Sequence, residues 1–122
     1  MKKLVLIIAV FATVHFASAQ GGNSQEAMIK YNLFKGDYKA KNYDAAYENW
    51  LWCLDNSPKL SVNIYKLGIE IAKHKLAKAA ETDKPAAMDL VKRVFDQRIK
   101  YYPKDLAKVY SDYADFLSEN NA

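Results

Sequence analysis

The chain has 122 residues and one cysteine, with 18 Lys and Arg against 14 Asp and Glu and a formal net charge of +4 at pH 7. Lys2 and Lys3 supply two of the cations, so the rest of the chain has 16 cations against 14 anions, which favours neither nucleic acid nor an anionic membrane as a partner. The single cysteine excludes an internal disulfide framework, so packing alone must stabilise the domain.

The N-terminal segment is typical of a secretory signal peptide. Lys2 and Lys3 precede an apolar stretch over residues 4–17, and the small-residue site Ala-Ser-Ala ends at Ala19. A membrane-spanning helix needs about 20 residues, so this stretch is short for an anchor, although an uncleaved anchor is the alternative. We expect cleavage after Ala19 and a flexible tail over 20–24. The cleaved chain is then expected to be exported without a membrane span, either to the periplasm or cell envelope or as a secreted protein.

The remaining sequence predicts a helical domain over residues 25–122. Apolar residues recur at spacings of three and four, the period of a helix, in five segments. In chain order, these segments are residues 25–41, 43–56, 61–80, 85–101 and 104–120. We expect Met28 on the buried face of the first helix, and Tyr110 and Ala114 on that of the last. Gly68 is the small residue that lets two helices cross closely. Asn42 suits the N-cap of the second helix, and Pro85 suits the first turn of the fourth. Short joins between consecutive helices indicate an all-α stack of antiparallel hairpins.

Three stretches carry the spacing of a helix-turn-helix repeat. They are IYKLGIEI (64–71), YSDYADFL (110–117) and AYENWLWCLDNSP (46–58). Their order matches the pattern W-x2-L-G-x2-Y, then A-x3-F, then P of a repeat of about 34 residues. The chain therefore resembles tetratricopeptide-repeat (TPR) proteins over residues 25–120, and in particular the N-terminal regions of exported TPR proteins of Bacteroidota. We expect two hairpins and a capping helix, or else a piece of a longer array.

The stretch around the two tryptophans is expected to serve packing. Trp50 takes the large aromatic position inside the hairpin, and Cys53 takes a small position that faces the neighbouring helix. We therefore expect a buried, protonated and inert thiol at Cys53. Trp52 lies about 200° round the helix from Trp50. It either packs under the next helix or is a surface anchor for a partner, since tryptophan is enriched at interface hot spots.

No set of residues indicates catalysis. One histidine in the helical part, His74, and one cysteine do not make a zinc site. Glu70 and His74 are expected to be a solvated pair, and Asp112 and Asp115 to lie on the polar face of the last helix away from any pocket. Phosphate-loop and nucleophile motifs are absent from the sequence. We therefore expect no enzyme, no metal and no cofactor.

The resemblance implies a binding module in which the first helix of each hairpin lines a concave groove for a peptide or protein segment. Carried onto this sequence, the groove-facing candidates are Asn32, Lys39, Tyr65, Ile69, Lys73, Ser111 and Asp115. The implied role is an exported scaffold or adaptor of a cell-envelope complex. The alternative is a structural protein that self-assembles into a homo-oligomer through its exposed aromatic faces.

Overall fold

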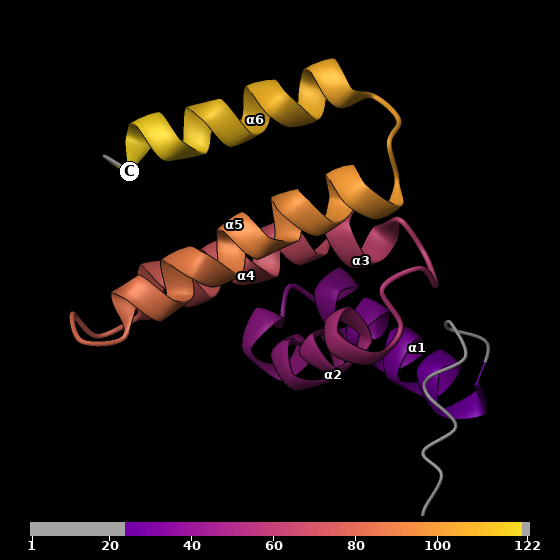
Figure 1. Ribbon diagram of the computed structural model, residues 1–122. Coiled ribbons are helices and arrows are strands. Elements are labelled where there is room, and N and C mark those ends of the chain that lie inside the picture. The colour runs from indigo at the N-terminus through magenta and orange to yellow at the C-terminus, as the bar shows by residue number, and fades with distance from the viewer. Residues whose placement is uncertain (1–23, 121–122) are drawn as a thin grey trace, which may run out of the picture.

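The computed structural model describes residues 24–120, and within this range every regular element is a helix. The helices are α1 (Gln25–Lys39), α2 (Tyr43–Asn56), α3 (Asn63–Lys66), α4 (Gly68–Lys78), α5 (Lys84–Tyr101) and α6 (Leu106–Glu119) (Figure 1). The expected all-α stack of five helices is confirmed, with the third helix divided into α3 and α4. The predicted signal peptide and residues 20–23 of the predicted tail lie outside the described residues.

The first hairpin is set by two side-chain caps. Ser24 Oγ accepts the backbone N–H of Ala27 at 3.1 Å and starts α1, and Asn42 Oδ1 accepts that of Ala45 at 3.3 Å and starts α2. Between the helices, Lys41 adopts a left-handed conformation with φ 58°, which reverses the chain within a few residues. The predicted N-cap at Asn42 is therefore confirmed.

The third helix is interrupted because a tryptophan takes one of its backbone carbonyls. The indole Nε1–H of Trp50 donates to the carbonyl oxygen of Ile64 at 2.8 Å. In an uninterrupted helix this oxygen would accept the N–H of residue 68, and the regular helix instead stops at Lys66 and resumes at Gly68. A Cβ on Gly68 would lie 2.1 Å from Trp50 Nε1, so only glycine admits the indole here.

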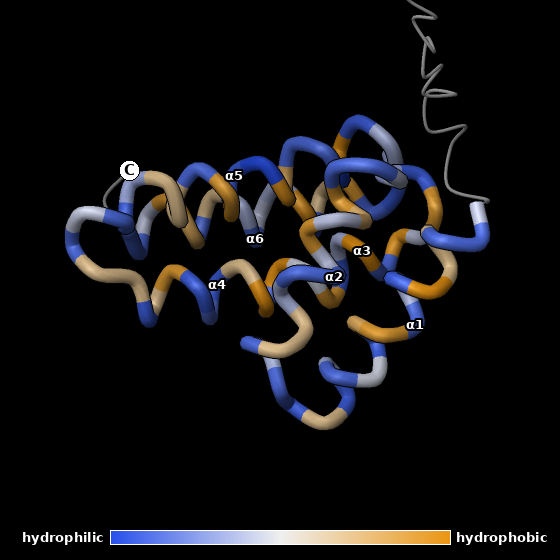
Figure 2. The backbone as a smooth tube through the Cα atoms, turned by 90° about the horizontal axis from the view of Figure 1, so that it is seen from below, coloured by the Kyte–Doolittle hydropathy of each residue, from blue (hydrophilic) through white to orange (hydrophobic). Residues whose placement is uncertain are grey.

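The helices pack around one core, in which hydrophobic positions gather where α1, α2 and α3 meet (Figure 2). Its largest fully buried side chains include Trp50, Tyr65 and Phe34. Two tyrosine hydroxyls, one on α3 and one just after α5, bind backbone carbonyls in the connection between α2 and α3. The Tyr65 hydroxyl donates to the Pro58 carbonyl at 2.6 Å, and the Tyr102 hydroxyl donates to the Lys59 carbonyl at 2.7 Å.

The buried faces of the first and last helices differ from those predicted. In α1 the buried residues are Ala27, Tyr31 and Phe34, while Met28, which was expected on that face, is 43% exposed. In α6 the buried residues are Val109 and Phe116, while Tyr110 is 53% exposed and Ala114 is also exposed. Each of these two helices packs against neighbours on one side only, so its spacing fits two adjacent faces and the sequence alone does not choose between them.

Within residues 24–120, no helix has both the length and the apolar character that crossing a membrane requires.

Candidate binding groove

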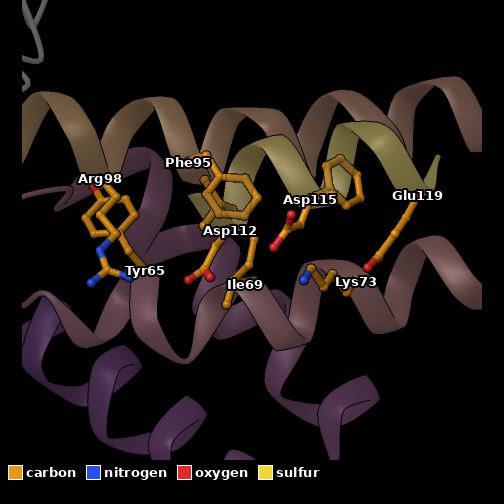
Figure 3. A pocket seen from close by; sticks show the side chains of 10 residues that line it. Tyr65, Ile69, Lys73, Phe95, Arg98, Asp112, Asp115 and Glu119 are labelled. Carbon is orange, nitrogen blue, oxygen red and sulfur yellow. The ribbon is translucent and has the colours of Figure 1, made fainter. Parts of the chain in front are cut away.

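A groove lies between α4 and α6, with α5 as its floor, and holds a pocket of about 220 Å³ (Figure 3). Its lining comes from α3 and α4 (Tyr65, Ile69, Lys73), from α5 (Val94, Phe95, Arg98) and from α6 (Asp112, Asp115, Phe116, Glu119). Four residues predicted from the repeat spacing are among them, namely Tyr65, Ile69, Lys73 and Asp115. The groove therefore brings together side chains that are up to 54 positions apart in the sequence, from Tyr65 to Glu119.

Aromatic stacking fixes α6 above α5 and so holds the groove open. The ring of Phe95 stacks on that of Tyr113, with centroids 4.6 Å apart and planes at 11°, and lies 6.1 Å from the ring of Phe116. Stacked rings at these distances contribute beyond their buried area. Since both α6 rings rest on one α5 side chain, Phe95 determines where the carboxylates of α6 lie relative to α4.

Tyr65 is part of the groove wall and offers no free hydrogen-bonding group. Its side chain is fully buried, and its hydroxyl already donates to Pro58 and accepts the Gln97 side chain at 3.4 Å. Burial raises the pKa of Tyr65 to about 12, so the phenol stays neutral at physiological pH. Tyr65 therefore contributes to the shape of the groove and not to polar recognition.

The exposed groove residues carry opposite charges. Lys73 and Asp115 lie opposite one another across the groove, on α4 and α6 (Figure 3). The Lys73 ammonium lies 5.9 Å from the centre of the Phe116 ring, so a cation already lies near this aromatic floor. Asp112, which was expected to lie away from any pocket, borders the groove and forms an ion pair with Lys108 at 2.7 Å. Asp115 also borders the groove, which agrees with its place among the groove candidates and not with the expectation that it lies away from any pocket.

Arg98 was missed by the sequence analysis, yet it lies at one end of the groove (Figure 3). Its Nε atom is buried and donates to no acceptor among residues 24–120. A buried donor without an acceptor destabilises a fold, so such groups are rare. In the sequence Arg98 is one of two cations in the last turn of α5, and nothing in that pattern distinguishes it from a solvated helix-end charge.

A second pocket of about 480 Å³ begins where the first ends, because Arg98 lines both. It is bounded by α3, the end of α5 and the connection to α6, through Val62, Lys66, Arg98, Tyr101, Tyr102, Pro103, Lys104 and Asp105. The backbone of Asp105 is left-handed there, with φ 54°, and this sharp reversal carries the chain from α5 into α6. The groove and this second pocket therefore adjoin at Arg98.

Three of the predicted groove residues lie elsewhere. Asn32 and Lys39 are exposed on α1, and Ser111 is exposed on α6, but none of them lines the groove. Ser111 lies outside it because the groove face of α6 is formed by residues 112, 115, 116 and 119. Trp52 is half-buried and packs against the core, which favours the packing interpretation over a surface anchor.

Cys53 is the buried thiol that the sequence predicted. Its side chain is fully buried, and burial raises its pKa to about 12. Because the thiolate is the nucleophilic form, the thiol is protonated at neutral pH. Within residues 24–120, no group of three or more His, Cys, Asp or Glu side chains is placed to hold a metal ion.

Glu70 and His74 lie at a solvent-exposed edge, as expected, but within residues 24–120 they do not pair with each other. Glu70 instead accepts the hydroxyl of Tyr38 at 2.8 Å and that of Tyr43 at 3.4 Å, and His74 lies 3.2 Å from Asp44. Both contacts join α4 to the first hairpin at a solvent-exposed edge. They therefore orient the hairpins rather than form a pocket.

Comparison of the chain with protein families, with curated proteins and with solved structures gives no significant match.

Proposed function

We propose that this chain is an exported, non-enzymatic interaction module that holds a peptide or protein segment in the groove between α4 and α6, as a scaffold or adaptor of a cell-envelope complex. The resemblance of residues 25–120 to TPR proteins supports this proposal. The observation that carries it is the position of Ile69, Lys73 and Asp115, which repeat spacing assigns to a partner groove and which line one pocket. Such a site acts by shape and polar recognition and needs no cofactor.

The groove has the features of a peptide site. Its floor is apolar, through Val94, Phe95 and Phe116, and its rim carries charges that fix orientation. The rim residues Lys73 and Asp115 are exposed, so a partner reaches them without rearrangement of the core.

Site-specific photo-cross-linking in the native host tests this function. A photoreactive phenylalanine analogue replaces Lys73 in one strain and Asp115 in a second, both of which are exposed groove positions. A third strain carries it at Glu48, which is exposed on α2 and lines neither pocket. We expect the same partner adduct from the two groove positions and none from Glu48. Equal labelling at all three positions, or labelling at Glu48 alone, contradicts the proposal.

Self-assembly is the second candidate, and exposed apolar side chains favour it. Ile29 and Leu33 on α1 are each 51% exposed, and Tyr110 on α6 is 53% exposed. The two helices lie at opposite ends of the stack (Figure 1), so contact between them joins copies head to tail. Light-scattering mass over a hundredfold concentration range tests this, and Leu33→Ser with Tyr110→Ser provides the matched variant. A monomer at every concentration rules out self-assembly.

A further inference from the structure

We propose that the groove selects a partner segment with an acidic residue at one end and a basic residue at the other, and so fixes the direction in which the segment lies. This inference rests on the proposed function and specifies its ligand. It follows from the separation of charge between the groove and the second pocket, which adjoin at Arg98.

One end of this surface is acidic. Asp112, Asp115 and Glu119 follow one another at spacings of three and four on α6, so they lie along one face of the helix and border the groove. Within residues 24–120, neither Asp115 nor Glu119 forms an ion pair. These two carboxylates therefore stay available to a cation from the partner. The Phe116 ring lies beside them, and the Lys73 ammonium is already 5.9 Å from the centre of this ring. An ammonium is therefore compatible with this part of the groove.

The other end is basic. Lys66, Arg98 and Lys104 border the second pocket against one carboxylate, Asp105. Lys66 and Lys104 are exposed, whereas the Nε–H of Arg98 is buried and lacks an acceptor among the described residues. Because a carboxylate from outside cannot reach the enclosed Nε–H of Arg98, the exposed cations Lys66 and Lys104 are the groups that an acidic side chain of the partner would meet at this end.

The length of the surface suits a short extended segment. α6 has 14 residues, which makes it about 21 Å long, and an extended chain covers that length in about six residues. Between the charged ends, Ile69, Phe95 and Phe116 present apolar surface. A segment with a glutamate, an apolar middle and a lysine matches the three parts in order.

Calorimetric titration with defined peptides tests this inference. The protein is purified in the form that its native host produces. The probes are acetyl-Glu-Gly-Leu-Ser-Leu-Gly-Lys-amide and the same peptide in reverse order, called here the two-charge peptides, with analogues in which both end residues are Lys or both are Glu. We expect both two-charge peptides to bind more tightly than either analogue, because each can place its glutamate at the basic end and its lysine at the acidic end. Equal affinity for all four peptides, or none at about 1 mM, overturns the inference.

Two pairs of surface substitutions locate the charges. Asp115→Asn with Glu119→Gln should weaken both two-charge peptides roughly fivefold, because each exposed ion pair contributes little. The same pair should leave the all-Glu analogue no weaker, since it removes carboxylates that repel the second glutamate of that analogue. Lys66→Gln with Lys104→Gln should weaken both two-charge peptides to a similar extent and leave the all-Lys analogue no weaker. Asp89→Asn with Glu48→Gln removes the same charge from exposed residues that line neither pocket, and an equal loss with this control pair contradicts the inference.

The two proposals fail in different ways. If cross-linking is specific to the groove but peptide affinity ignores the charges, the charge selection is wrong and the interaction module stands. If groove positions capture no more than Glu48, the proposed function itself is wrong.

Discussion

The contact between Gly68 and Trp50 provides the sharpest prediction about stability. In Gly68→Ala the added Cβ would lie 2.1, 2.7 and 2.9 Å from Nε1, Cε2 and Cζ2 of Trp50. The indole must therefore move, although its side chain is fully buried. Movement breaks the 2.8 Å hydrogen bond to the Ile64 carbonyl and leaves a buried acceptor unpaired.

The magnitude follows from three opposing contributions. Overpacking costs about 1–3 kcal/mol, and the unpaired buried carbonyl costs about 1–3 kcal/mol more. The better helix propensity of alanine returns about 1 kcal/mol. We therefore expect Gly68→Ala to lower the free energy of unfolding by about 1–5 kcal/mol, a large part of the stability of a small domain.

Urea unfolding followed by far-UV circular dichroism measures this change, with tryptophan emission as a local reading of the indole. Gly36→Ala is the matched control, because a Cβ there meets no atom of the described residues within 4 Å. Gly36 lies inside α1, so its replacement should stabilise the fold by about 0.5–1 kcal/mol. The same substitution should thus have opposite signs at the two positions. Unchanged or increased stability in Gly68→Ala would refute the reasoning.

A double-mutant cycle separates the steric cause from a general effect of alanine. Trp50→Phe removes the indole N–H and shrinks the ring, so the added methyl group at position 68 should cost less in that background. We expect a coupling of about 1–2 kcal/mol between the two substitutions, because the residues are in contact. Additive effects would mean that the indole does not limit residue 68.

Three further predictions concern the core and its titration. Tyr65→Phe should lower the free energy of unfolding by about 1–2 kcal/mol in urea titrations and Tyr102→Phe by less, because the first hydroxyl bond is part-buried and the second exposed. Burial raises the pKa of Cys53 from 9.0 to about 12. Because the thiol ionises at lower pH in the unfolded chain, the stability that the buried thiol contributes is complete below pH 9 and is lost as pH rises towards 12. Urea midpoints should therefore fall less steeply between pH 9 and 12 in Cys53→Ala than in the unmodified protein. Phe116→Ala should cost about 3–5 kcal/mol and release α6 from Phe95, which hydrogen exchange would report as lost protection confined to that helix; protection lost equally in α1 would contradict it.

The sequence predicted those features that depend on local periodicity. The five helical segments follow from apolar spacing, and Asn42 and Pro85 occupy the terminal positions expected of them. The positions of Ile69 and Lys73 could be predicted because both lie on α4, whose buried residues define one face of the helix. Gly68 was singled out as a small residue at a close helix approach, and its neighbour proves to be Trp50.

The features that the sequence did not predict depend on contacts between helices. The break between α3 and α4 arises because an indole 14 residues away binds the Ile64 carbonyl, and no local pattern encodes that choice. Arg98 becomes unusual only through the burial of its Nε atom. In the same way, the pairing of Glu70 with two tyrosines of the first hairpin requires the hairpins to be placed relative to one another.

The last helix shows why its two faces were confused. The repeat spacing assigned Tyr110 and Ala114 to a buried face, and both are exposed, while Val109 and Phe116 are buried against α5. Tyr110 directly follows Val109, and Ala114 lies two positions before Phe116. A spacing of three or four residues therefore fits either face of α6, and only the packing of Val109 and Phe116 against the rest of the core decides which face is buried.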